Sequence, residues 1–210
     1  MPRRVDHEER RAHITAALLR IAGTRGLQAV SMREVAAEAG ISLRLVQYYA
    51  RDKQTLLRLG LDELAARLDR RVRERAAARG AGLAPRAVVE VVLTSILPID
   101  EASRLDRMAW SAYFAVALTD PALLAGATNH PDALEDWLTT VLARARDAGD
   151  VAPGRDPRTE VAALLALTNG LSDSVVGGQR DADAALAILG YQLDRLFDRS
   201  TRAEAPDGLG

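Results

Sequence analysis

The chain of 210 residues has no cysteine, a single lysine, three histidines and only 4% aromatic residues. Without cysteine it can form no disulfide, thiolate nucleophile or cysteine-ligated metal site. The histidines, His7, His13 and His130, lie too far apart, and too far from paired carboxylates, to suggest a metal motif. No Glu-x-x-His pair occurs either, which argues against a carboxylate-bridged metal enzyme. We therefore expect no cofactor, no metal and no catalytic site.

The sequence also lacks a long apolar run. The most apolar segments, residues 87–97 and 161–167, are interrupted by Glu90 or too short to cross a bilayer. Residues 1–9 lack the apolar stretch of a secretory signal. We therefore expect no membrane partner and a cytoplasmic location. The 48% hydrophobic and 27% charged residues are typical of a folded globular protein.

The composition favours helices along the whole chain. Leu, Ala, Arg and Glu dominate, alternating β-branched runs are missing, and Gly and Pro occur at intervals. The pattern predicts an all-α fold of about nine helices. These helices are expected at residues 8–25, 31–39, 42–49, 53–78, 86–97, 101–118, 132–148, 158–176 and 182–198.

The segment of residues 31–53 carries the most informative pattern. Ser31 is a candidate N-cap, Glu34 completes a capping box with it, and Ser42 caps the next short helix. Gly40 permits a sharp turn between the two helices. Two short capped helices joined in this way have the proportions of a helix-turn-helix motif. The small core of this motif is expected to consist of Val35, Ala36, Ile41, Val46 and Tyr49.

One side of the second helix of this motif contributes no residue to the expected core. The residues on that side are Leu43, Arg44, Gln47 and Tyr48. A DNA major groove admits one α-helix, and there Arg and Gln can contact guanine and adenine while leucine contacts a thymine methyl. The hydroxyls of Ser31 and Ser42, at helix N-termini, are suited to phosphate oxygens. Helix corners of this kind also occur in other all-α proteins, so the spacing alone leaves the function open.

Charge is distributed unevenly along the chain. The formal net charge is −1, but residues 1–53 carry +4 and residues 54–210 carry −5. Such an asymmetry is typical of a segment that faces nucleic acid. The lone lysine, Lys53, lies at the end of the basic segment.

The first 57 residues resemble the TetR family of transcriptional regulators. The match runs through TRG at 24–26, SMREVA at 31–36, AGIS at 39–42 and VQYY at 46–49, then Lys53 and Leu56-Leu57. Farther along, LPIDE at 97–101, Trp110 and Asp120-Pro121 are similar to the BetI-like subgroup.

The resemblance implies two sets of DNA contacts. The residues expected to face bases are Arg33, Leu43, Arg44, Leu45 and Gln47. Tyr48 and Lys53 occupy positions that hold phosphate in the family. Two positions depart from its pattern, because Arg44 stands where glycine is common and Ala50 where phenylalanine is common. The operator sequence of relatives therefore cannot be transferred to this chain.

The resemblance further implies a homodimeric repressor of operator DNA that responds to a small-molecule effector. A DNA-binding regulator without an effector is the alternative. We expect a helix-turn-helix domain at 1–53, an effector-binding and dimerisation domain at 54–200, and a disordered tail at 201–210. The helices at 158–176 and 182–198 are apolar enough to bury a second face. They are expected to form a four-helix bundle with a second copy.

Several residues in the C-terminal part are candidate ligand contacts. The apolar candidates, each of which could equally be ordinary core, are Met108, Trp110, Tyr113, Phe114 and Trp137. Asn169 and Asp173 lie four residues apart in an apolar run, where polar groups need partners. That partner could be a ligand, a neighbouring helix or the second copy.

Overall fold

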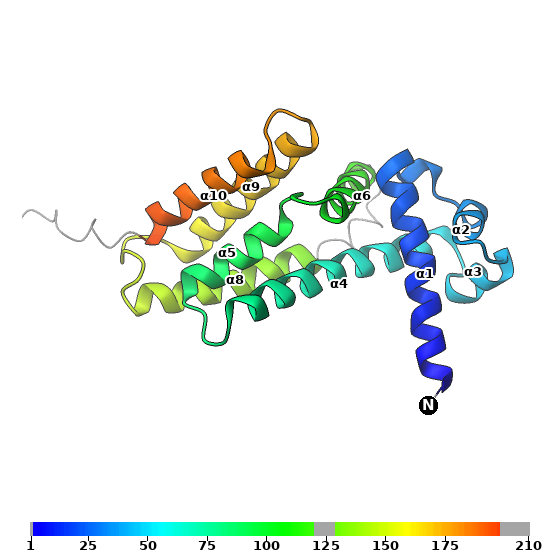
Figure 1. Cartoon of the computed structure of the whole chain (residues 1–210), viewed down its shortest axis with the longest axis horizontal. Coiled ribbons are helices and arrows are strands. Elements are labelled where there is room, and N and C mark those ends of the chain that lie inside the picture. Colours follow the sequence, from blue (N-terminus) through cyan, green and yellow to red (C-terminus); the bar gives the residue numbers. More distant parts are fainter. Residues whose placement is uncertain (1, 120–128, 198–210) are drawn as a thin grey trace, which may run out of the picture. The chain divides into compact units, whose positions relative to one another are not determined.

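The computed structural model describes the backbone of residues 2–119 and 129–197 and the side chains of residues 7–119 and 132–197. This described part contains nine α-helices, one short 3₁₀ helix and no strand, so the prediction of an all-α fold is confirmed (Figure 1). The tail expected at 201–210 lies outside the described residues.

The helices form two compact units. Among the described residues, the first unit runs up to Arg71 and resumes at Pro98, and the second covers Val72–Leu97 and the residues from Asp132 onward. The first unit holds α1 (Pro2–Arg25), η1 (Leu27–Ala29), α2 (Met32–Ala39), α3 (Leu43–Tyr49), α6 (Glu101–Ala117) and the larger part of α4 (Lys53–Arg79). The second holds α5 (Pro85–Ile96), α8 (Asn129–Asp147), α9 (Pro157–Val176), α10 (Ala182–Phe197) and the end of α4.

Helix α1 is the centre of the first unit. Its periodic residues Ile14, Leu18 and Ile21 are almost completely buried, because α2, η1 and α6 all pack against it. Gly26, with a φ of 81°, lets the chain leave α1 in a conformation that other residues rarely adopt. The compact unit around the helix-turn-helix includes α6 and much of α4. The functional domain boundary expected after Lys53 stays a prediction.

An ion cluster joins α4 to α6 within the first unit. The Asp106 carboxylate accepts hydrogen bonds from Arg67, at 2.9 Å, and from Arg71. Arg67 also binds Glu63 one turn earlier on α4. The side chain of Asp106 is only 6% exposed, so this charge depends on its two arginine partners.

Most helix ends agree with the sequence-based prediction to within two residues, but three details differ. Helix α1 begins at Pro2 rather than residue 8, because its polar first turns are helix-forming without apolar periodicity. The 3₁₀ turn η1 was not predicted. Helix α8 begins at Asn129, so the loop expected at residues 129–131 is part of a helix.

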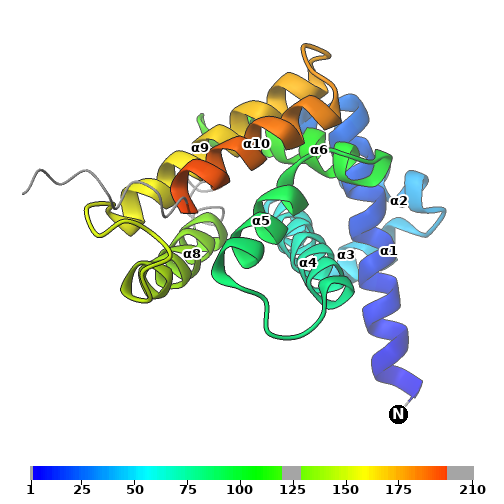
Figure 2. The same cartoon turned by 60° about the vertical axis from the view of Figure 1, so that its left-hand side comes forward.

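In the second unit, α9 and α10 lie side by side and pack with α5 (Figures 1 and 2). Five leucines of α9 and α10 are buried within this unit: Leu164, Leu171, Leu189, Leu193 and Leu196. Arg86 at the start of α5 binds Glu90 and also Asp194 of α10.

Candidate nucleic-acid interface

The turn between α2 and α3 depends on Gly40, which has a left-handed conformation with a φ of 64°. The backbone N–H groups of Gly40 and Ile41 donate to the carbonyls of Ala37 and Ala36, at 3.1 and 3.0 Å. These bonds satisfy the last carbonyls of α2 and direct the chain into α3. The sharp turn predicted at this glycine is confirmed.

Serine side chains cap both helices of the motif. The Ser31 hydroxyl accepts a hydrogen bond from Glu34 N at 3.1 Å, and Ser42 accepts one from Leu45 N at 3.2 Å. The prediction of a capping box at Ser31 is wrong, because the Glu34 carboxylate accepts a hydrogen bond from Arg25, at 3.0 Å, instead of one from the Ser31 backbone. Each serine hydroxyl keeps its own proton, which remains able to donate to a phosphate oxygen.

Helix α3 turns one face to the core and another to the outside. Val46 and the C-cap residue Ala50 are completely buried. On the outer side, the exposed residues are Arg44, Gln47 and Tyr48, and Tyr48 is 69% exposed. Leu43 and Leu45 are half-buried, and Leu43 packs against the core of the first unit. The helix thus presents a cation, an amide and a phenol at the spacing of one helical face.

The remaining predicted contacts lie at the edges of this face. Arg33 in α2 and Lys53 at the start of α4 are both exposed. Asp52 precedes Lys53 and caps α4, with Thr55 N donating to its carboxylate at 2.7 Å. That backbone N–H and the Thr55 hydroxyl lower the pKa of Asp52 below its ordinary value. The ionised cap fixes the first turn of α4 and with it the backbone position of Lys53.

The sequence pattern did not predict an aromatic contact that the structure shows between α1 and α3. The Tyr49 hydroxyl lies 2.9 Å from His7 Nδ1, and the His7 ring stacks against Tyr48 at 6.0 Å between centroids. Tyr48 and Tyr49 meet edge to face at 5.2 Å. His7 and Tyr49 are 42 residues apart, so helical periodicity carries no signal of their contact.

The α6 candidates for ligand binding have different environments. Met108 and Phe114 are exposed, at 37% and 56%, whereas Trp110 is half-buried against the core of the first unit. Tyr113 is 2% exposed and its hydroxyl donates to the Leu57 carbonyl at 2.9 Å. Burial raises the pKa of the Tyr113 hydroxyl, and the Asp62 carboxylate raises it further. Tyr113 is therefore a core residue that joins α6 to α4.

The other three candidates belong to the second unit. Trp137 in α8 is 47% exposed. Asn169 and Asp173 are exposed on α9, next to the buried Thr168 and Ser172. Their partner, whether a ligand, a neighbouring helix or the second copy, therefore stays a prediction. The buried hydroxyls of Thr168 and Ser172 donate to backbone carbonyls one turn earlier.

The described residues hold neither a metal site nor a helix that could span a membrane. No group of three His, Asp or Glu side chains there is arranged to hold a metal ion. None of the described helices combines the length and apolar character that a membrane crossing needs.

Both parts of the chain match family models. Residues 14–59 match the model described as bacterial regulatory proteins of the tetR family. Residues 85–198 match the model described as the C-terminal part of BetI-type transcriptional repressors.

Individual relatives agree with these matches. The HTH-type transcriptional regulator BetI of Burkholderia thailandensis is 29% identical over 200 residues, which cover 94% of this chain and 98% of that relative. The HTH-type transcriptional regulator PksA of Bacillus subtilis is 26% identical over 172 residues, covering 82% and 81%. The solved structure of a transcriptional regulator from Rhodococcus sp. Rha1 superposes with a TM-score of 0.75 at 26% identity, covering 89% of this chain and 95% of that one. These relatives are regulators, in agreement with the expectation that the chain is not an enzyme.

Proposed function

Because this chain belongs to the TetR family of bacterial regulatory proteins, we propose that it is a dimeric repressor released from its operator by a small-molecule effector. The repressor role is supported by the description of the model that matches residues 85–198. The observation that carries the proposal is the orientation of α3, which exposes Arg44 and Gln47 while burying Val46. A cytoplasmic location is part of the same proposal.

We assign the base contacts to α3 and its neighbour α2. The residues that face bases in this proposal are Arg33, Leu43, Arg44, Leu45 and Gln47. Ser31, Ser42, Tyr48 and Lys53 would contact phosphates along the flanking strands. Because Leu43 and Leu45 are only half-buried, part of each side chain remains accessible to a thymine methyl.

Sequence-specific binding to an operator is tested by selecting the DNA fragments that the protein binds from the organism's own genome. Purified protein is expected to enrich a small set of fragments that share a palindromic sequence, since a two-fold dimer reads two half-sites about one helical turn apart. Binding to all fragments alike would contradict a sequence-specific regulator. Expression of a reporter behind the enriched site should fall when the protein is present, and a rise would reverse the proposed sign.

The dimer interface is proposed on the exposed faces of α9 and α10. The outward residues of α9 include Ala162, Ala166 and Gly170, and those of α10 include Ala187 and Tyr191. Small side chains let two helices approach closely, and a Cβ added at Gly170 would meet no atom of this chain within 4 Å. Two helices from each copy would complete a four-helix bundle.

Ala166→Arg tests the interface, because it places a charge in the centre of the proposed contact. We expect this variant to elute as a monomer in size-exclusion chromatography with light scattering. The matched control is Ala78→Arg, which adds the same charge at an exposed site near the end of α4. A dimer that survives Ala166→Arg would place the interface elsewhere.

The effector would act by preferring a conformation that cannot bind DNA. A coupling free energy of about 1–3 kcal/mol corresponds to a loss of operator affinity of roughly 5- to 150-fold. Within the first unit, Met108, Trp110 and Phe114 on α6 are the candidate contacts. In the second unit they are Trp137, Asn169 and Asp173, all with exposed surface. Tyr113 would contribute by holding α6 in place.

The chain has two tryptophans, one in each unit, and this makes the effector contact measurable. A metabolite panel can be titrated while intrinsic fluorescence is followed in the wild type and in Trp110→Phe and Trp137→Phe. The variant that abolishes the fluorescence change identifies the unit that binds. An operator complex that no compound in a cell extract weakens would favour the alternative of a regulator without an effector.

A further inference from the structure

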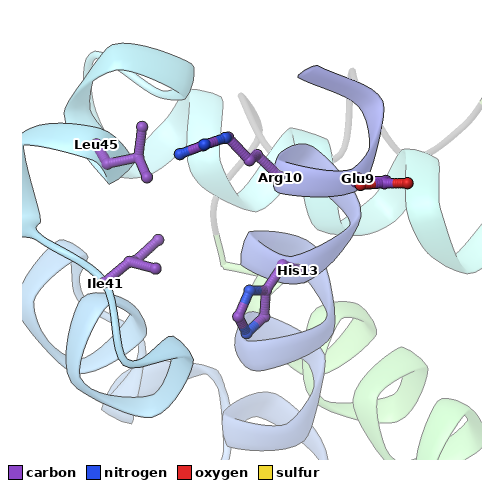
Figure 3. Close-up of a pocket in the computed structure, with 5 residues that line it drawn as sticks. All are labelled: Glu9, Arg10, His13, Ile41 and Leu45. Carbon is purple, nitrogen blue, oxygen red and sulfur yellow. The ribbon is translucent and has the colours of Figure 1, made fainter. Parts of the chain in front are cut away.

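A pocket of about 280 Å³ lies between α1 and the helix-turn-helix, and Leu45 is its only lining residue with a contact assigned above. It is lined by Glu9, Arg10, His13, Ile41 and Leu45. Figure 3 shows Arg10 extending from α1 toward Leu45 of α3, and the His13 ring lying across from Ile41. The Glu9 carboxylate points away from these two apolar residues. The pocket is therefore cationic where it borders α3.

Side chains of α1 reach α3 and the turn that precedes it at two places. His7 contacts Tyr48 and Tyr49 at the end of α3, whereas Arg10 and His13 lie beside Leu45 and Ile41 near its start. At a rise of about 1.5 Å per residue, the stretch of α1 from His7 to His13 covers about 9 Å. The face of α1 that carries His7, Arg10 and His13 thus flanks the recognition helix.

The dimensions of DNA determine what this flank would meet. A major groove is about 12 Å wide, and an α-helix with its side chains is about 10–12 Å across, so α3 alone fills the groove. Side chains of α1 that reach the flank of α3 would then meet the phosphate strand at the edge of the groove. The pocket would open toward that strand.

We propose that Arg10 and His13 bind a phosphate of the operator backbone in this pocket. The inference rests on the proposed function, because it requires α3 to occupy the groove. Arg10 supplies a permanent cation with several donors, and the His13 imidazole supplies an N–H donor. Ile41 and Leu45 form the apolar wall of the pocket. The site adds a contact from α1 to those of α2, α3 and the start of α4.

The salt dependence of binding to DNA tests the site without knowledge of the operator. The probe is a fluorescein-labelled duplex of arbitrary sequence, about 30 base pairs long, titrated by anisotropy between about 50 and 200 mM KCl. Arg10→Ala is expected to weaken binding about five- to tenfold and to make the slope of log Kobs against log [KCl] shallower by about 0.9 for each bound protomer. Arg10→Lys is expected to restore the slope, because it restores the charge.

The matched control is the adjacent Arg11, which does not line the pocket. Arg11→Ala removes the same charge from the same turn of α1, and we expect it to leave the slope unchanged. His13→Ala should weaken binding without altering the melting temperature. Equal effects of Arg10→Ala and Arg11→Ala, or no effect of either, would overturn the site.

The failure of this site and the failure of the proposed function give different results. A wild type that does not bind the duplex at about 50 mM KCl contradicts the function itself. If the wild type binds the duplex, and Lys53→Ala but not Arg10→Ala makes the salt slope shallower, only the proposed phosphate site in the pocket is contradicted. If inorganic phosphate binds at Arg10 while Arg10→Ala leaves DNA binding intact, the pocket is a site for a free anion and the proposal is wrong.

Discussion

The Tyr113 hydroxyl donates its hydrogen bond to the Leu57 carbonyl directly beside Gly60, and a Cβ at Gly60 would overlap that hydroxyl oxygen. The same Cβ would come within 2.6 Å of Leu18 Cδ2. Three helices of the first unit, α1, α4 and α6, therefore meet at a glycine. The absence of a side chain there lets the tyrosine of α6 reach the backbone of α4.

Gly60→Ala is expected to lower the free energy of unfolding by about 1–3 kcal/mol, because the added methyl group overpacks this contact. The measurement is urea denaturation followed by circular dichroism. A double-mutant cycle with Tyr113→Phe provides the control, since removal of the hydroxyl relieves part of the overlap. The two changes should then cost less together than the sum of the single effects, and simple additivity would contradict the contact.

Asp106→Ala is expected to lower the free energy of unfolding by about 3 kcal/mol, since it leaves Arg67 and Arg71 without their shared carboxylate. The comparison is Asp147→Ala, which removes a 70% exposed carboxylate that pairs with Arg146. That change should cost no more than about 1 kcal/mol. Similar costs for the two variants would mean that the cluster on α4 and α6 contributes no more than a surface pair.

Arg44→Ala is expected to weaken binding to the selected operator by about 1–3 kcal/mol without lowering the melting temperature, because Arg44 is exposed and in our proposal reads a base. Anisotropy titrations at fixed salt provide the affinity. Arg158→Ala, which removes an exposed arginine in the second unit, is the charge-matched control. Unchanged operator affinity in Arg44→Ala would remove this residue from the interface.

Lys53→Ala is expected to weaken operator and random DNA to the same extent, since a phosphate contact carries no sequence information. The salt slope should become shallower by about 0.9 for each bound protomer. A loss confined to the operator would point to a base contact instead.

Asp156 makes the start of α9 sensitive to acid. The Thr159 hydroxyl and backbone N–H, at 2.7 and 2.8 Å, lower the pKa of this N-cap carboxyl. Because the folded pKa lies below the unfolded one, the charged cap stabilises the protein above about pH 4, and this contribution is lost as pH falls through the folded pKa. The difference in melting temperature between wild type and Asp156→Ala should shrink from about pH 7 to about pH 3. A difference independent of pH would show that ionisation of the cap does not matter.

The helix-turn-helix was predictable because its signals are local. Ser31 and Ser42 bind backbone groups three residues away, and Gly40 forms its turn with neighbours on α2. The periodicity of α3 likewise separated Val46 from Arg44 and Gln47, because residues three or four apart share a helical face.

Contacts between distant segments were not predictable in this way. The sequence placed Glu34 in a capping box, but in the fold Arg25 lies close enough to bind it. The sequence made Tyr113 a candidate for ligand binding, but in the fold its hydroxyl donates to the Leu57 carbonyl of α4. His7 contacts Tyr49 only because α1 begins several residues before its first apolar repeat, and the side chains of these early turns reach α3.

The sequence by itself determined the helices, the caps and which residues share a face. The tertiary structure alone decided which of those faces are covered. Asn169 and Asp173 illustrate the difference, because their spacing placed them on one side of α9 but could not say that Thr168 and Ser172 occupy the buried side. The physical reason is that backbone hydrogen bonds and caps act within a few residues, whereas burial depends on which helices pack together.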